Sequence, residues 1–219
     1  MGDGAQGAGS TEPVVDVLAP REVLGHEVLV EGRIFDLVRD EVDLDHTVVH
    51  REYVDHPGAV AVVVLDDHDR VLLLKQYRHP VRRELWEPPA GLLDVAGEAA
   101  QIGAARELAE EADLVAATWH TLVDYYTTPG GNNEALRVFL ARDLSPVPEA
   151  DRHVREDEER DIEPRWVPLD DAADAVLRGD LHNPSAVVGV LAAVASRAGG
   201  WASLRPADAP WPERRQAQD

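Results

Sequence analysis

Three glutamates in the stretch Ala90–Leu114 are the residues of this chain best suited to hold a metal ion. Glu107 and Glu111 are four residues apart, so on an α-helix they lie one turn apart on one face, with Glu110 beside them. Like charges at this spacing cost a helix about 0.2–0.5 kcal/mol, so the cluster does not serve helix stability. Carboxylate oxygens suit Mg²⁺, which uses a few carboxylates and keeps its other positions for water and phosphate. The alternative for these glutamates alone is a solvated acidic helix face.

The sequence around the glutamates predicts how they are held. Apolar residues recur at steps of three and four and form a stripe typical of a helix packed on a core, namely Ile102, Ala105, Leu108, Ala109 and Ala112. A glycine-bounded loop, GLLDVAGE, leads into the helix start. Arg106 is placed to pair with Glu98 or Glu110, so we expect it to brace this loop against the helix.

Together these residues resemble the sequence box of the Nudix hydrolases, which reads Gly, five residues, Glu, seven residues, Arg-Glu-aliphatic-any-Glu-Glu-any-Gly-aliphatic. Its positions are matched by Gly91, Glu98, Arg106, Glu107, Leu108, Glu110, Glu111 and Leu114. Two departures occur. Six residues separate Gly91 from Glu98, and Asp113 stands where the box has its closing glycine. Asp tolerates the left-handed conformation that ends a helix better than most residues, and neither departure removes a carboxylate.

The composition bounds the possible functions. The 219 residues are 44% hydrophobic, which is ordinary for a globular chain with a real core. With 42 acidic and 21 basic residues the formal net charge is −21, which argues against binding duplex nucleic acid. A small phosphorylated substrate remains compatible if metal ions supply local positive charge. There are no cysteines, so disulfide and thiolate chemistry is excluded. The N-terminal residues carry no signal-peptide pattern and no run of about 18 apolar residues occurs, so we expect a cytoplasmic protein without a membrane span.

The elements around the box predict an α/β fold. Residues 1–19 are expected to be disordered, and alternating residues in 20–56 predict a small antiparallel β meander. Strands are expected at 58–65, 71–77, 118–126 and 135–141, and helices at 170–178 and 184–198. The β-branched apolar run Gly58–Leu65 indicates a strand buried on both faces.

Strands on both sides of one central helix, with more helix at the end, indicate an α/β/α sandwich with a mixed sheet over residues 57–198. This is also the fold that the Nudix resemblance implies. The tail at 199–219, rich in Pro, Ala and Arg, is expected to be loosely held.

Features outside the box resemble the ADP-ribose pyrophosphatase branch of the family, in its actinobacterial form. Pro129 follows Leu114 by fifteen residues in YYTTPGGNNE, for which an ordinary Pro-Gly turn is the alternative. The segments QYRH, LWEPPAGLLD and LHNPSAVVGVLAA agree with that branch. The resemblance implies Mg²⁺-dependent hydrolysis of ADP-ribose to AMP and ribose 5-phosphate, with Mn²⁺ as a possible ion. Two alternatives are a pyrophosphatase for another nucleoside diphosphate sugar or dinucleotide, and a non-catalytic ADP-ribose sensor.

The resemblance also assigns the reacting residues. It makes Glu107 and Glu111 the metal ligands together with the backbone carbonyl of Ala90, and Glu110 a third ligand or a partner of the ligands. The branch places its general base outside the box, on an acidic loop, which corresponds here to REDEERDIEPRW. Glu159 or its neighbour Glu158 stands at that position. A solvated run of charge is the usual alternative for such a segment.

Substrate contacts are expected from other loops. Arg78 could pair with a phosphate, because a guanidinium offers a planar fork of donors. The resemblance places Arg51 and Glu52 at the adenine end, the backbone of Leu92 at phosphate or ribose, and Glu134 at the terminal ribose. Each of the charged residues could instead be an exposed group at a strand end.

The meander predicts an assembly as well as a fold. A small isolated meander buries too little apolar surface to be stable alone, so residues 20–56 need a partner surface. The branch resembled here packs this segment across a two-fold axis, which implies a homodimer. The alternative is a meander that folds back on its own core and leaves a monomer.

Overall fold

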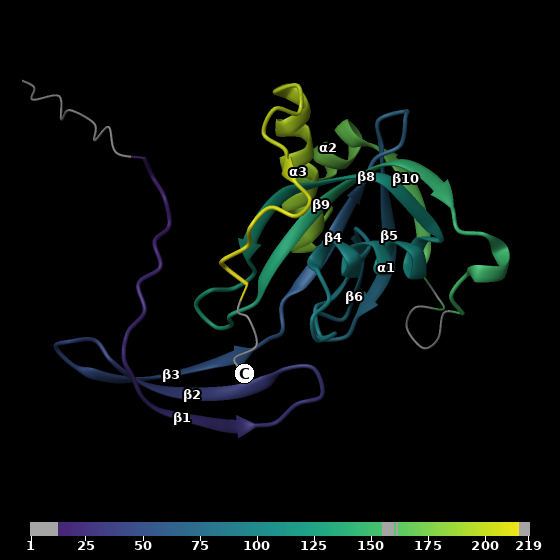
Figure 1. Cartoon of the computed structure of the whole chain (residues 1–219). Coiled ribbons are helices and arrows are strands. Elements are labelled where there is room, and N and C mark those ends of the chain that lie inside the picture. The colour runs from purple at the N-terminus through teal and green to yellow at the C-terminus, as the bar shows by residue number, and fades with distance from the viewer. Residues whose placement is uncertain (1–12, 155–159, 161, 215–219) are drawn as a thin grey trace, which may run out of the picture.

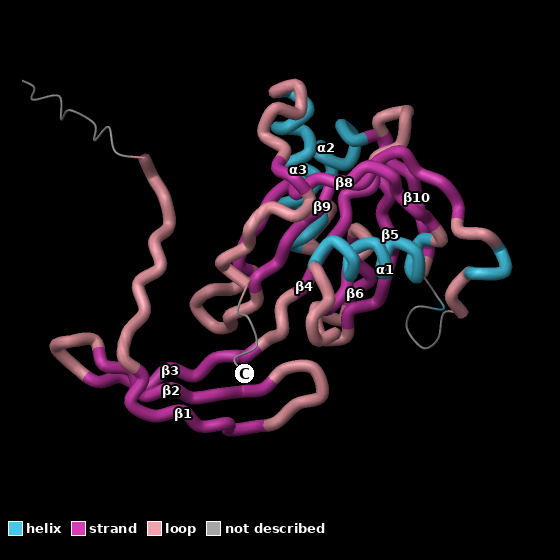
Figure 2. The backbone as a smooth tube through the Cα atoms, viewed as in Figure 1, coloured by secondary structure: helices cyan, strands magenta, loops and turns pink. Residues whose placement is uncertain are grey.

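The computed structural model describes residues 13–154, 160 and 162–214, and these residues fold into a mixed α/β structure (Figure 1, Figure 2). In chain order the elements are β1 (Val23–Val30), β2 (Asp36–Asp43), β3 (Val48–Asp55), β4 (Ala59–Val64), β5 (Arg70–Arg78), β6 (Arg83–Glu87), β7 (Ala90–Leu92), α1 (Ala100–Ala112), β8 (Leu114–Tyr126), β9 (Ala135–Pro146), the 3₁₀ turn η1 (Glu149–Asp151), β10 (Glu163–Pro168), α2 (Leu169–Arg178), α3 (Pro184–Ala198) and β11 (Arg205–Pro206). In this part of the chain no helix is long and apolar enough to cross a bilayer.

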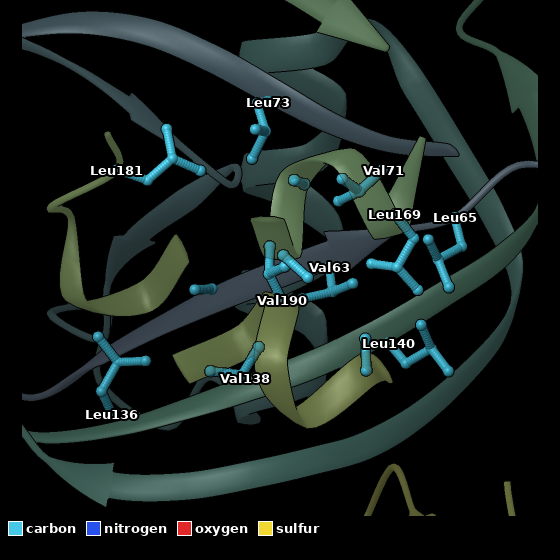
Figure 3. Close-up of a cluster of buried hydrophobic side chains, with 14 of the residues drawn as sticks. Val63, Leu65, Val71, Leu73, Leu136, Val138, Leu140, Leu169, Leu181 and Val190 are labelled. Atoms are coloured by element: carbon cyan, nitrogen blue, oxygen red, sulfur yellow. The ribbon is translucent and has the colours of Figure 1, made fainter. Parts of the chain in front are cut away.

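The body of the molecule is built on a five-stranded sheet in the order β11-β8-β9-β4-β7. Strands β4 and β9 are parallel, whereas the other neighbouring pairs in this sheet are antiparallel, so the sheet is mixed. A second sheet, β10-β5-β6, completes the body. Two hydrophobic clusters fill it, one with residues of α1 and the other with residues of α2 and α3. Figure 3 shows the cluster with residues of α2 and α3.

Strand β4 shows why its sequence is continuously apolar. All six of its residues are buried. Val60, Val62 and Val64 belong to the cluster with α1, whereas Ala61 and Val63 belong to the cluster with α2 and α3. Because successive side chains of a strand point to opposite faces, both faces of β4 lie inside the sandwich. The predicted strand, its burial and the α/β/α architecture with a mixed sheet are therefore confirmed.

Three strands of the body had no clear signal in the sequence. Strands β6 and β7 flank Pro88 and Pro89, whose lack of a backbone N–H ends one strand before the next begins. Strand β10 carries two charged residues, two prolines and two large apolar residues among its six, shows no regular alternation of apolar residues, and pairs with β5 at one edge of the second sheet. Its two prolines weaken the strand signal in the sequence, because a proline cannot donate a ladder hydrogen bond and is found mainly on edge strands.

Strands β1–β3 form the predicted antiparallel meander, which lies beside the sandwich in Figure 1. Many of its apolar side chains are about half exposed, from 48% to 59%, and these are Val23, Leu24, Val28, Val30, Ile34, Phe35 and Val48. Residues 13–22 precede the meander without helix or strand and are exposed. The meander therefore offers a large apolar surface that its own sheet does not cover.

The prediction of a loosely held tail is wrong for residues 199–214. Strand β11 pairs with β8, and Arg137 of β9, only 2% exposed, donates to the backbone carbonyls of Ala209 at 2.7 Å and Pro210 at 3.1 Å. Arg137 also forms two hydrogen bonds with Asp124 and lies over the Trp211 ring. A buried guanidinium needs acceptors, and the tail supplies two of them.

Candidate active site

The three residues of β7 bring the two ends of the glutamate box together. Glu111 is only 8% exposed, and its Oε2 accepts the backbone N–H of Ala90 at 2.9 Å. Glu107 lies against Gly91, where an added Cβ would stand 2.0 Å from the Glu107 Cδ. Only glycine leaves room for a carboxylate so close to the strand. The two carboxylates that are one turn apart on α1 therefore converge on the backbone of β7.

The buried face of α1 differs from the predicted apolar stripe. Ala104 and Leu108 are fully buried and Glu111 is nearly so, whereas Ile102 is 56% exposed. The spacing from 104 to 108 to 111 still follows one helical face, but this face includes a glutamate. The predicted stripe is therefore right at Leu108 and wrong at Ile102, because a carboxylate takes a place on the inward side, where it binds the N–H of Ala90.

Arg106 connects the carboxylates of the box, as expected from its spacing. Its Nη1 lies 2.6 Å from Glu107 and 3.3 Å from Glu110, and its Nη2 lies 3.2 Å from Glu98. The hydrogen bonds to Glu98, with further attraction from Glu107, raise the pKa of Arg106 above its usual range. Arg106 therefore stays protonated and holds the loop end at Glu98 beside the helix that carries Glu107.

The two departures from the box pattern are both accommodated by backbone conformation. Gly97, in the lengthened loop, has a φ of 77°, which L side chains rarely adopt. Asp113 ends α1 in the left-handed conformation with φ 54° and ψ 35°, and its N–H bonds the carbonyl of Ala109 at 3.2 Å. Asp113 thus takes the conformation expected at the position of the missing glycine.

The geometry fits a metal ion that is held only partly by protein side chains. Among the described residues no three His, Asp or Glu side chains gather closely enough to hold an ion by themselves. Arg106 contacts Glu107 and Glu110, and Glu111 accepts the N–H of Ala90. Mg²⁺ typically binds through one or two carboxylates plus water and substrate phosphates, so the pair Glu107 and Glu111 supplies a suitable hard-oxygen donor set.

Arg78, the expected phosphate contact, is held by a residue that the sequence analysis missed. Its Nε lies 3.0 and 3.1 Å from the two carboxylate oxygens of Glu87, and its Nη2 lies 2.6 Å from one of them. Glu87 is 3% exposed, whereas the Arg78 side chain is 41% exposed. A buried carboxylate needs a partner. The glutamate inside the otherwise apolar WEPPA segment was therefore the sequence feature from which an ion pair could have been expected.

Glu134 lies at the end of the sheet where β7 also ends. The register pairs Ala59 of β4 with Leu92 on one side and with Leu136 on the other. Glu134 precedes Leu136 by two residues. It therefore lies at the same end of the sheet as Leu92. The Glu134 Oε2 accepts the hydroxyl of Thr127 at 2.7 Å, and its Oε1 lies 3.7 Å from His56 Nδ1.

Arg51 and Glu52 lie on the meander, away from the box, and face opposite sides of β3. This follows from the alternation of side chains along a strand. Glu52 binds Arg39 at 2.6 and 3.0 Å, whereas Arg51 is paired in register with Asp40 and donates to the carbonyl of His50 at 2.9 Å. One face of a single meander therefore cannot present the side chains of both Arg51 and Glu52 to the same adenine ring.

The two candidates for the general base, Glu158 and Glu159, lie outside the described residues. The segment around them connects η1 to β10, and β10 pairs with β5, the strand that ends at Arg78. Their assignment stays a prediction from the sequence.

Comparison with known proteins agrees with this arrangement. The model of the NUDIX domain matches residues 55–187. The chain is 46% identical over 194 residues to an ADP-ribose pyrophosphatase of Mycobacterium tuberculosis, covering 88% of this chain and 92% of that protein. It is 36% identical over 163 residues to an ADP-ribose pyrophosphatase of Bacillus subtilis, covering 74% and 86%. The crystal structure of an ADP compounds hydrolase has the same fold, with a TM-score of 0.69 at 22% identity over 85% of this chain and 98% of that one.

The chain therefore belongs to the Nudix family. Hydrolases of this family generally depend on a divalent metal ion, which agrees with the pair of carboxylates on α1.

Proposed function

We propose that this protein hydrolyses the pyrophosphate bond of ADP-ribose, in the presence of Mg²⁺, to give AMP and ribose 5-phosphate. The observation that carries the proposal is the convergence of Glu107 and Glu111 on the backbone of Ala90 and Gly91. All the carboxylates of the box are present, which favours catalysis over a sensor that only binds its ligand. The substrate is supported by the two ADP-ribose pyrophosphatases to which most of the chain is similar.

The residues on and around α1 prepare the site for the ion and the diphosphate. Glu107, Glu111 and the carbonyl of Ala90 would hold Mg²⁺, with Mn²⁺ as the alternative ion, and Glu110 would support them. When bound, the divalent ion neutralises phosphate charge and lowers the pKa of water. Arg106 keeps Glu107 in place and limits the repulsion between the carboxylates.

The remaining residues bind the substrate and move the proton. Arg78, oriented by Glu87, would bind a phosphate, and the backbone of Leu92 would contact phosphate or ribose. Glu134 would accept hydroxyls of the terminal ribose. Glu159, or Glu158 if the register differs by one, would take the proton of the attacking water.

A substrate panel tests the proposal directly. Products are resolved for ADP-ribose, ADP-mannose, GDP-mannose, NADH and a diadenosine polyphosphate, each with Mg²⁺ and with Mn²⁺. We expect the highest kcat/KM for ADP-ribose, with AMP and ribose 5-phosphate as products and no turnover in excess chelator. A higher kcat/KM for another substrate would assign the enzyme to that nucleoside diphosphate. Tight binding of ADP-ribose without turnover would identify a sensor.

We also infer that the working unit is a homodimer formed through the meander, and that the protein works in the cytoplasm. The half-exposed apolar side chains of β1–β3 call for a covering surface, and a second copy of the chain supplies an identical one. Arg51 and Glu52 face opposite sides of β3. If the β3 strands of two subunits border the same adenine, one subunit can supply Arg51 and the other can supply Glu52. Some residues of the adenine pocket would then come from the other chain.

Two measurements test the homodimer. Sedimentation equilibrium at micromolar concentration should give about twice the 24.0 kDa mass of the chain, and a monomer would exclude the assembly. Mixing an Arg51→Ala chain with a Glu111→Gln chain should restore activity, because mixed dimers regain one intact site. Each variant alone is the control. No recovery after proven subunit exchange would place the whole site within one chain.

A further inference from the structure

The last strand of the meander is hydrogen-bonded to the loop at 127–134, which joins β8 to β9. The N–H of Val54 donates to the carbonyl of Gly131 at 3.0 Å, and the N–H of Asn133 donates to the carbonyl of Val54 at 3.3 Å. An isolated bridge pairs Val54 with Asn132. The meander is thus joined to the body by a covalent connection at 56–58 and by this loop, which comes from a distant part of the sequence.

The side chain of Asn133 uses both halves of its amide in this contact. Its Oδ1 accepts the backbone N–H of His56 at 2.8 Å, and its Nδ2 donates to the Asp55 carboxylate. An N–H and a carboxylate require opposite ends of one amide, so these partners fix its orientation. An aspartate would keep only the acceptor, and an alanine would keep neither.

The position of Asn133 gives this contact a functional consequence. Along the chain it precedes Glu134, whose carboxylate is held by Thr127 and lies near His56. Across the contact it holds Asp55, the final residue of β3, and Arg51 stands four residues earlier on the same strand. A strand rises about 3.3 Å per residue, so Arg51 lies roughly 13 Å from Asp55 along β3.

We propose that Asn133 is a positioning residue that fixes the meander, and with it Arg51, relative to the loop that carries Glu134. This rests on the proposed function, in which Arg51 binds the adenine end of a substrate and Glu134 binds the terminal ribose. It holds whether Arg51 serves the site of its own chain or that of a second subunit, because β3 carries Arg51 in both cases.

The connection next to Asn133 explains why a side-chain contact is needed there. After Asp55 the chain passes through His56 and Pro57 to Gly58, which has a φ of 88° and lies close to the carbonyl of Ala135. The two backbone hydrogen bonds at Val54 alone would let β3 rotate about its C-terminal end. The Asn133 amide adds contacts at Asp55 and His56, which oppose such a rotation.

Steady-state kinetics of Asn133→Ala and Asn133→Asp test the proposal. Both should raise KM for ADP-ribose about tenfold while kcat changes less than about threefold, because misplaced binding groups weaken binding more than a chemical step in which they take no part. Asn133→Asp keeps the acceptor for His56 but sets a second carboxylate beside Asp55. Asn183→Ala is the matched control, since Asn183 caps α3 by accepting the N–H of Ala186 at 3.0 Å. It should lower the melting temperature and leave KM unchanged.

A double variant separates positioning from general destabilisation. In an Arg51→Ala background, adding Asn133→Ala should change KM less than about twofold, since the group it positions is already absent. Amide hydrogen exchange at Val54 and His56 should be faster in Asn133→Ala than in Asn183→Ala. Unchanged KM, or full additivity with Arg51→Ala, would overturn the positioning role. If ADP-ribose is not hydrolysed, the proposed function fails, and the same KM series on the substrate hydrolysed fastest still decides the role of Asn133.

Discussion

Replacing Glu111 by glutamine should lower turnover by about a hundredfold or more and leave the fold intact. Glutamine keeps a carbonyl oxygen that can accept the N–H of Ala90, so the buried position stays satisfied. It removes the negative charge that would hold the metal ion. Changes to residues that only support metal ligands typically cost about 10- to 100-fold in metal affinity or activity, and loss of a ligand should cost at least as much.

The effect of Glu111→Gln is measured in three ways. These are kcat at saturating substrate, the Mg²⁺ concentration required for half-maximal rate, and calorimetric binding of Mg²⁺ or Mn²⁺ to the protein without substrate. Thermal unfolding reports on the fold. Glu110→Gln is the graded comparison. Glu110 lies on the same helix with a 32% exposed side chain, pairs with Arg106 at 3.3 Å and would only support the ligands, so its change should cost less than Glu111→Gln. Near-normal turnover and metal dependence in Glu111→Gln would remove this residue from the site.

The part of the site that could be predicted from the sequence is its local part. The spacing of Glu107 and Glu111 fixes their common helical face, because the period of an α-helix depends on nothing outside it. The same reasoning placed Arg106 beside Glu98 and Glu110, and Asp113 at a left-handed helix end. The helix stripe failed only at Ile102, where the inward position of Glu111 changed which face is buried.

Contacts between different elements could not be predicted in this way. Glu87 holds Arg78 across two strands, and Asn133 reaches His56 over 77 residues. Such pairs depend on strand register and loop docking, which a single sequence does not specify. The tail was misjudged for the same reason, since the buried Arg137 that binds it lies in another element. By contrast, the opposite orientation of Arg51 and Glu52 follows from strand alternation alone and was available from the sequence.

Replacing Glu159 by glutamine should lower kcat by about 10²–10⁴-fold, the usual contribution of a general base. Glutamine has nearly the size of glutamate but cannot take a proton from water. Since the lost interaction acts in the chemical step, KM for ADP-ribose and the affinity for Mg²⁺ should change much less than kcat. This pattern differs from that expected for Glu111→Gln, in which metal affinity falls together with the rate.

Glu158→Gln is the matched control, because the two glutamates are adjacent in the same acidic segment and differ by one position in register. If Glu158→Gln is the damaging change, the base is Glu158 and the alignment with the branch shifts by one residue. If neither change affects kcat, the acidic segment does not supply the base. Glu110 and Glu134 then become the candidates, since both are carboxylates that the structure places at the box or at the adjoining end of the sheet. Glu134→Gln would separate them, because it should lower kcat if Glu134 is the base and raise KM if Glu134 only binds ribose.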